Sequence, residues 1–238
     1  AVSPTQRHCS NMKQRMNASL IPWQSIDTVL FDMDGTLLDL NYDNQVFSHL
    51  LPTAYARKHG LSEEDAQTQL HSHMMQILGR MDFYRFAYWN QFTGLDMAAL
   101  HRQAAQLICF LPGAEHFLQQ VTASGKRALI VTNADRQSFV IKDSELQLTA
   151  KVDSVVSSHD FNTPKEAPEF WQTLVAKMSI DPARALLVDD TPRVLDAARS
   201  FGIGHTLAVA KPDTQKPARQ DLGHTSFSHY GELLAGLV

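Results

Sequence analysis

Residues 28–36, with the sequence TVLFDMDGT, are the starting point for predicting the fold of this chain. The first four are apolar or β-branched, which is typical of a buried strand. Asp32, Asp34 and Gly35 follow directly, and two carboxylates placed two residues apart repel each other unless a cation or a proton lies between them. Because glycine tolerates the backbone geometry of a sharp turn, Gly35 lets both carboxylates face one cavity. The stretch therefore predicts a buried strand that ends in a chemically active turn.

Further strands and helices are predicted to alternate in the second half of the chain. Short apolar runs followed by polar residues occur at 127–131, 152–157, 185–188 and 206–209. Helical spacing is found at 113–124, 137–146, 168–178 and 192–201. This alternation predicts an α/β fold with a doubly wound, Rossmann-like parallel sheet, in which ligands bind at the carboxyl ends of the strands. After a polar loop, a last short strand and a helix over 230–237 are expected to end the chain.

A helical insertion is predicted between the first strand and the second. No strand-like run occurs between about residues 40 and 112, and apolar residues recur there at helical spacing. The expected helices cover 44–59, 63–78, 82–92 and 96–110. We therefore expect three parts, which are a flexible leader at 1–20, a core domain formed by 21–40 and 112–238, and a helical bundle at 41–111 that forms a lid. The leader lacks a signal-peptide pattern, and Met16 is an alternative start of the natural chain.

Composition excludes several classes of protein. The chain has 238 residues and a formal net charge of −4, so a general binder of nucleic acid or of anionic membranes is not expected. Two cysteines cannot form a disulfide framework, and Cys109 is expected to be a buried small side chain. The longest apolar runs are far shorter than the roughly 18 residues that a membrane helix needs. These features predict a soluble cytoplasmic protein, either a monomer or a homodimer.

A second acidic pair follows another apolar strand. Asp189 and Asp190 come directly after the run 185–188. Carboxylates at two strand ends of one parallel sheet form a hard oxygen site that suits Mg²⁺ with several waters retained. The next residues, Thr191 and Pro192, allow the alternative that Asp190 only caps a helix. Taken together with Asp32 and Asp34, the pair favours a metal site.

Two further positions carry candidate phosphate ligands. Thr132 and Asn133 end the strand that begins at Arg127, and a hydroxyl beside a backbone N–H can hold a phosphate oxygen, although such a pair is also common in ordinary turns. Lys165 follows Pro164 where a loop meets a helix. A lone lysine is usually exposed, but this one is placed to balance an anionic substrate beside four carboxylates.

The order of these residues resembles the four motifs of the haloacid dehalogenase (HAD) superfamily. The motif residues are Asp32-x-Asp34-Gly35-Thr36, Thr132, Lys165 and Asp189-Asp190, and the resemblance covers residues 27–238. The helical insertion is similar to the C1-type cap of that superfamily. Several further residues resemble those of the bacterial GMP/IMP 5′-nucleotidase branch of this superfamily. They are Trp23-Gln24, residues 27–40, Tyr84, Tyr88-Trp89 and Pro164-Lys165-Glu166.

The resemblance implies a phosphohydrolase with an aspartyl-phosphate intermediate. Asp32 would be the nucleophile, and Asp34 would protonate the leaving oxygen and then activate water. Mg²⁺ would be held by an Asp32 oxygen, the Asp34 main-chain carbonyl and Asp190, with Asp189 acting mainly through bound water. Thr132, the Asn133 N–H and Lys165 would hold and neutralise the phosphoryl group.

The second aspartate separates branches of the superfamily. Dehalogenases lack an acid at that position and related transport ATPases carry threonine, so Asp34 favours phosphatase or phosphomutase chemistry. Response-regulator receivers use a similar set of residues in a different order and lack a cap, which makes a phospho-accepting switch the weaker hypothesis. A non-catalytic binding protein is disfavoured because no motif residue is missing.

The lid is expected to select the substrate. The segment 80–90 carries aromatic and basic side chains, and we predict base contacts from Arg80, Tyr84, Arg85 and Trp89. The alternative is that the aromatic residues, which have helical spacing, form the core of the lid. The predicted substrate is a small phosphorylated metabolite, a purine 5′-monophosphate such as GMP or IMP. A sugar phosphate, phosphoglycolate or phosphomutase chemistry remains the alternative.

Overall fold

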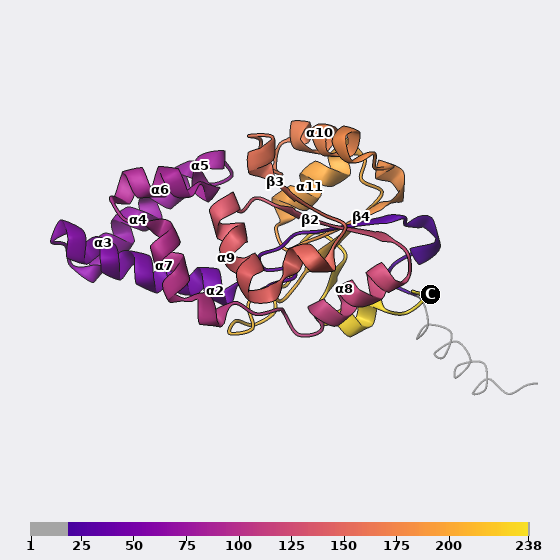
Figure 1. Ribbon diagram of the computed structural model, residues 1–238, viewed down its shortest axis with the longest axis horizontal. Coiled ribbons are helices and arrows are strands. Elements are labelled where there is room, and N and C mark those ends of the chain that lie inside the picture. The colour runs from indigo at the N-terminus through magenta and orange to yellow at the C-terminus, as the bar shows by residue number, and fades with distance from the viewer. Residues whose placement is uncertain (1–18, 238) are drawn as a thin grey trace, which may run out of the picture.

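A six-stranded parallel sheet forms the centre of the protein (Figure 1). The computed structural model describes residues 19–237, so most of the expected leader lies outside the described residues. The strand order is β3-β2-β1-β4-β5-β6, and every neighbouring pair is parallel. The strands are β1 (Thr28–Phe31), β2 (Arg127–Thr132), β3 (Ser154–Ser157), β4 (Ala185–Asp189), β5 (His205–Val209) and β6 (Ser226–Phe227). The chain winds outward from β1 in one direction and from β4 in the other. The predicted doubly wound α/β fold is therefore confirmed, with its switch point between β1 and β4.

Helices cover both faces of the sheet. They are α8 (Ala114–Ala123), α9 (Arg136–Leu146), α10 (Pro168–Met178) and α11 (Pro192–Phe201). Phe31 of β1 packs in one hydrophobic core with Phe117 of α8, whereas its neighbour Leu30 packs in a second core with Trp171 of α10. Side chains alternate between the faces of a strand, so a fully apolar β1 needs a core on each side. Figure 1 shows α10 and α11 on the opposite side of the sheet from α8.

A group of helices connects β1 to β2 and lies together at one end of the sheet (Figure 1). These helices are α2 (Asn41–Gln45), α3 (Leu51–His59), α4 (Glu63–Ile77), α5 (Met81–Tyr84), α6 (Phe86–Thr93) and α7 (Met97–Gln103). A π-helical stretch, Val46–Leu50, joins α2 to α3 and ends two residues before Pro52, a residue that cannot donate a backbone hydrogen bond. Between residues 19 and 237, no helix has both the length and the apolar character needed to cross a bilayer.

Tertiary contacts change two of the predicted helices. The helix expected over 82–92 is broken at Arg85, because the carboxylate of Asp135, the residue that caps the start of α9, accepts the Phe86 backbone N–H at 3.1 Å. The prediction of a terminal helix over 230–237 was wrong. Only a 3-10 turn forms, Tyr230–Leu233, and the Leu233 carbonyl accepts the Trp23 indole N–H at 3.0 Å instead of continuing a helical ladder.

The helix expected over 96–110 ends early, at Gln103, and the chain then returns toward the sheet. Cys109 lies on this return segment and is exposed, which contradicts the expectation that it is buried. Its backbone carbonyl accepts the Asp39 N–H at 3.0 Å. The segment is extended rather than helical, so side chains alternate and the preceding residue, Ile108, is the buried one.

Candidate active site

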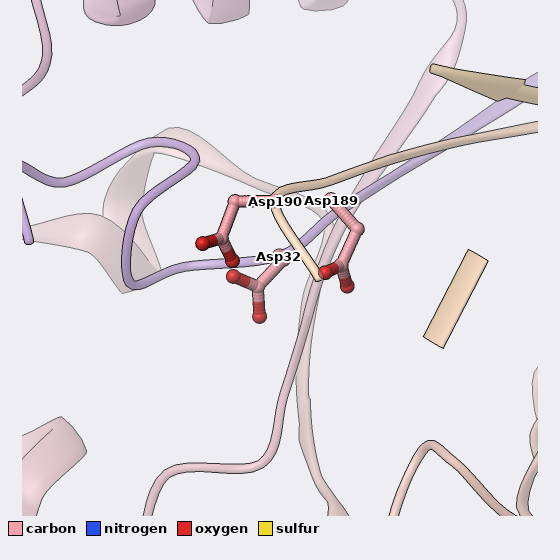
Figure 2. Close-up of side chains that lie close together, drawn as sticks. All are labelled: Asp32, Asp189 and Asp190. Carbon is pink, nitrogen blue, oxygen red and sulfur yellow. The ribbon is translucent and has the colours of Figure 1, made fainter. Parts of the chain in front are cut away.

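Three aspartates meet at the switch point of the sheet. Asp32 directly follows β1, and its backbone N–H donates to the Val188 carbonyl of β4 at 2.9 Å. Asp189 ends β4, and Asp190 follows it. One carboxylate oxygen from each aspartate lies within 4.8 Å of the others, and all three side chains are buried. Figure 2 shows the three carboxylates gathered where these two strands end.

Lys165 lies between two of these carboxylates. Its Nζ is 2.6 Å from Asp32 Oδ1 and 2.8 Å from Asp189 Oδ2, and it also donates to the Val131 carbonyl at 3.0 Å. Although burial alone would lower the pKa of the Lys165 ammonium, the carboxylates of Asp189 and Asp32 raise it. The lysine is therefore charged, and it holds the Asp32 carboxylate in one place.

The donor set suits a hard divalent cation. Burial raises the pKa of Asp32 well above its usual value; Lys165 opposes this shift, and the charges of Asp189 and Asp190 add to it. The Arg219 side chain is partly exposed, and its Nη2 lies 3.6 Å from Asp190 Oδ2, which is too far for a hydrogen bond, so it offsets the charge of this carboxylate only weakly. Negative charge thus exceeds positive charge in a buried space lined by carboxylate oxygens, which are the ligands that Mg²⁺ prefers.

The Asp34 side chain lies in a separate ion-pair network. Lys142 of α9 is 1% exposed, and its Nζ lies 2.6 Å from Asp34 Oδ1 and 2.9 Å from Asp43 Oδ1. Burial alone would lower the pKa of Lys142, but the two carboxylates outweigh it and raise the pKa. Neither Lys142 nor Asp43 was predicted from the sequence as a residue of the site. The one available signal is weak: a lysine three residues after Phe139 lies on the apolar face of its helix.

The remaining predicted phosphate ligands lie beside this site. Thr132 ends β2, and its Oγ1 accepts the Ala134 N–H at 3.0 Å. The Asn133 side chain accepts the Lys165 backbone N–H at 3.0 Å and donates to Glu166 Oε2 at 3.0 Å. Asn133 therefore ties the end of β2 to the loop that carries Lys165.

A cavity of about 610 Å³ connects the sheet edge with the helical insertion. Asp32, Asp34, Thr132, Asn133, Lys165 and Asp190 line it on the side of the sheet. The insertion contributes a mainly apolar wall that includes Phe47, Met74, Leu78, Phe83, Tyr84, Phe86, Trp89 and His101. The space thus has a charged end and an apolar end.

Hydrogen bonds from α5 and α6 help to hold the helical insertion against the core. The Tyr84 hydroxyl donates to Glu166 Oε1 at 2.7 Å, and the Phe86 N–H donates to Asp135. Burial raises the pKa of Tyr84, and the Glu166 carboxylate adds to the shift. Because Glu166 also binds Asn133, the insertion is linked to the loops that carry the candidate phosphate ligands.

The four predicted base-contacting residues do not share one place. Tyr84 and Trp89 line the cavity, whereas Arg80 and Arg85 are not among its lining residues. The Arg80 side chain is 66% exposed, and Arg85 donates to Asn162 Oδ1 at 2.7 Å. Trp89 is 1% exposed, and its indole N–H donates to the Phe83 carbonyl at 2.8 Å. The indole N–H is therefore already bonded within the insertion, and only the face or edge of the ring is left to line the cavity. Trp89 therefore belongs to the core of the insertion as well as to the cavity wall.

The fold and the carboxylates at its switch point define a class of hydrolase, and comparison with known proteins agrees. The family model for haloacid dehalogenase-like hydrolases matches residues 26–202. The chain belongs to this family, as its motifs indicated.

Individual proteins that are similar to this chain include two enzymes and one solved structure. The chain is 33% identical over 218 residues to the GMP/IMP nucleotidase YrfG of Escherichia coli (strain K12), which covers 92% of this chain and 98% of the relative. It is 23% identical over 203 residues to validoxylamine A 7′-phosphate phosphatase of Streptomyces hygroscopicus subsp. limoneus, covering 81% and 90% of the two chains. The crystal structure of a HAD phosphatase from Thermococcus onnurineus superposes with a TM-score of 0.74 at 20% identity, covering 90% of this chain and all of that one. The predicted resemblance to the nucleotidase branch is confirmed at the level of sequence.

Proposed function

We propose that this protein is a Mg²⁺-dependent phosphomonoesterase that acts on GMP and IMP through an aspartyl-phosphate intermediate. The main support is Asp32, a buried carboxylate 2.6 Å from Lys165 that lines a cavity of about 610 Å³ beside a second acidic pair. Cavities of roughly 300–1,000 Å³ bind ligands of drug size, which includes a nucleoside monophosphate. The 33% identical relative from E. coli, a GMP/IMP nucleotidase, supports the substrate class.

In the first step, an Asp32 carboxylate oxygen attacks phosphorus, and the bond from phosphorus to the ester oxygen breaks. Lys165 holds Asp32 and offsets the negative charge that gathers on the phosphoryl oxygens. Thr132 and the Asn133 N–H orient these oxygens. Asp34 gives a proton to the departing ester oxygen, so that the nucleoside leaves as an alcohol.

In the second step, Asp34 accepts a proton from a water molecule as that water attacks the phosphorus of the phosphoaspartate. The bond from phosphorus to the Asp32 oxygen breaks, which releases inorganic phosphate and restores the carboxylate. The contact of Lys142 Nζ with Asp34 Oδ1 at 2.6 Å keeps the Asp34 side chain in one orientation in both steps, as a hydrogen bond to the neutral acid before its proton is given up and as an ion pair afterwards, and Asp43 shares that lysine.

Asp32, the Asp34 main-chain carbonyl and Asp190 would hold Mg²⁺, and the clustering of the buried Asp32, Asp189 and Asp190 carboxylates supports this assignment. When bound, the ion supplies positive charge that offsets the charge of the phosphoryl oxygens. Asp189, which is hydrogen-bonded to Lys165, is placed to act mainly through bound water.

We also propose that the chain divides into a core formed by residues 21–40 and 112–238 and a cap formed by residues 41–111. The cavity lies where the two parts meet, and the hydrogen bond from Tyr84 to Glu166 joins them. A cap in this place excludes water from the phosphoryl group and contacts the rest of the substrate. The cytoplasmic location, the absence of nucleic-acid partners and a monomeric or homodimeric state stay predictions.

A substrate panel tests the proposed function. Phosphate release would be measured from GMP, IMP, AMP, ribose 5-phosphate, glucose 6-phosphate and phosphoglycolate, with Mg²⁺ and with EDTA. We expect kcat/KM for GMP and IMP to exceed that for the sugar phosphates at least about ten-fold, because a base that fills the apolar end of the cavity adds binding energy. EDTA is expected to reduce activity to background, and excess Mg²⁺ to restore it.

Other outcomes of the panel would select an alternative. Preference for a sugar phosphate or phosphoglycolate would keep the phosphatase mechanism and reject the purine substrate. Conversion of a sugar phosphate into its isomer without phosphate release would indicate a phosphomutase. Full activity in EDTA would reject the role given to Mg²⁺.

Gly35→Ala is expected to disrupt the acidic site. Gly35 has a φ of +80°, and a Cβ atom there would lie 2.9 Å from both Cγ and Oδ2 of Asp190. Backbone strain alone costs about 1–3 kcal/mol, and the clash displaces a proposed metal ligand as well. Gly60→Ala is the matched control, because Gly60 has a φ of +68° with nothing within 4 Å of the added atom. We expect both variants to lower the urea midpoint and only Gly35→Ala to lower activity by ten-fold or more; equal activities would contradict this account.

A further inference from the structure

Tyr84 is a residue of the helical insertion whose hydroxyl is already bonded to the core. It is the last residue of α5 and lines the cavity, and its hydroxyl donates to Glu166 Oε1 at 2.7 Å. A tyrosine hydroxyl has one hydrogen to donate, so this hydrogen is not available to a ligand while the contact lasts. The role of the hydroxyl therefore depends on what Glu166 does.

The Glu166 carboxylate joins three parts of the site. Its Oε1 accepts the Tyr84 hydroxyl, and its Oε2 accepts the side-chain amide of Asn133 at 3.0 Å. Glu166 also directly follows Lys165 in the chain. One carboxylate thus contacts the insertion and the end of β2, and it belongs to the loop that carries the lysine. Because its two oxygens are covalently fixed to each other, a shift of one contact shifts the other.

Asn133 continues the connection to the reacting end of the cavity. Its side chain is buried, and its Oδ1 accepts the Lys165 backbone N–H at 3.0 Å. The Nζ of the same lysine lies 2.6 Å from Asp32 Oδ1. The Asn133 side chain is therefore bonded through both its oxygen and its nitrogen, which fixes the backbone N–H that is proposed to hold a phosphoryl oxygen. Hydrogen bonds thus lead without a gap from Tyr84 to the proposed nucleophile.

We infer that Tyr84 and Glu166 are positioning residues through which the docked insertion aligns Asn133 and Lys165 for phosphoryl transfer, an inference that rests on the proposed phosphomonoesterase function. It differs from the base contact that the sequence predicts for Tyr84. In-line transfer is sensitive to small displacements of the groups that hold the nucleophile and the phosphate. A positioning pair therefore affects kcat for every ester, whereas a residue that binds the base affects nucleotides alone and mainly changes KM.

The test compares Tyr84→Phe with Tyr88→Phe in the full-length chain. Both changes remove one hydroxyl from a hydrogen bond in the insertion. The Tyr88 hydroxyl lies 2.8 Å from His73 Nε2, also in the insertion, and Tyr88 is not among the described residues that line the cavity. We expect Tyr84→Phe to lower kcat about ten-fold for GMP and for ribose 5-phosphate alike, with KM within about two-fold of wild type. Tyr88→Phe is expected to keep kcat within about two-fold for both substrates.

Variants of Glu166 test whether Tyr84 acts through it. Glu166→Ala removes the contacts with both Tyr84 and Asn133, and we expect kcat to fall about a hundred-fold. Glu166→Gln keeps an oxygen for Asn133 and an NH₂ group that can donate to the Tyr84 oxygen, so it is expected to recover at least about ten-fold of that loss. Adding Tyr84→Phe to Glu166→Ala is expected to change kcat less than about two-fold, because the contact is already absent.

The wild type separates the failure of the proposed function from the failure of this inference. If the wild type releases phosphate from none of the esters, the proposed function fails, and the positioning role fails with it. If the wild type is active and Tyr84→Phe matches Tyr88→Phe, lowers activity with GMP alone, or changes KM rather than kcat, the hydrolase stands and the positioning role is rejected.

The double variant provides a second way to overturn the inference. A further ten-fold loss on adding Tyr84→Phe to Glu166→Ala would show that Tyr84 acts without Glu166. If Glu166→Ala does not fold, the two tyrosine variants, each measured with GMP and with ribose 5-phosphate, decide the question by themselves.

Discussion

Asp32→Asn is expected to abolish phosphate release, with kcat falling at least about a thousand-fold. The side-chain amide of asparagine cannot form the acyl phosphate that the first step requires. The variant also lacks one charge of the buried acidic cluster. We expect acid-quenched wild type to carry a phosphoryl group on the peptide that contains Asp32, and the variant to carry none.

Asp27→Asn is the matched control for this variant. Asp27 stands directly before β1 and Asp32 directly after it, so the same chemical change is made at opposite ends of one strand. Asp27 pairs with Arg184 at the surface, far from the carboxyl end of the sheet. Activity is expected to stay within two-fold of wild type in Asp27→Asn. If Asp32→Asn keeps a tenth of the wild-type rate, Asp32 is not the nucleophile.

Lys165→Met is expected to give the largest loss of stability as well as a loss of activity. Lys165 is 2% exposed and pairs with both Asp32 and Asp189, so its removal leaves two buried carboxylates without their cation. Breaking a buried ion pair in this way costs about 3–5 kcal/mol. For a chain of this size that corresponds to a fall in Tm of roughly 10 °C. Thermal unfolding in EDTA measures the effect without a contribution from metal binding.

Lys216→Met provides the comparison. The Lys216 side chain is 63% exposed and lies 3.4 Å from Asp213, a buried aspartate that also accepts the Asn44 amide and the Gln215 N–H. Because Asp213 keeps these partners when the exposed lysine is removed, we expect a loss of about 0–1 kcal/mol and melting within about 3 °C of wild type. Equal melting temperatures for the two variants would show that the buried cluster does not depend on Lys165.

Short-range patterns in the sequence were enough to predict the sheet and the residues at its switch point. The run 28–31 and the later apolar runs predicted five of the six strands to within two residues, because a buried strand needs consecutive apolar side chains. Asp32, Lys165, Asp189 and Asp190 were chosen from their positions after strands and loops. Parallel strands bring their carboxyl ends to one edge, so a residue's position after its strand already predicts its neighbourhood.

Helix ends and the apolar end of the cavity were determined by tertiary structure. Asp135 breaks a helix at Arg85 through a hydrogen bond from a residue about 50 positions away, and Trp23 shortens the last helix across more than 200 positions. Neither contact has a local pattern, because propensities report only on nearby residues, whereas tertiary hydrogen bonds override them.

Lys142 and His101 are residues of the cavity region whose surroundings could not be predicted from local sequence either. As single residues in helical segments they look like an exposed lysine and an ordinary histidine. Only the folded chain places Lys142 between Asp34 and Asp43, and buries His101 against Tyr42 and Phe86. The sequence by itself determined the fold class and the charged end of the site, since both follow from local periodicity and from residues at strand ends. The apolar end was decided by tertiary structure, because its chemistry depends on which buried groups meet.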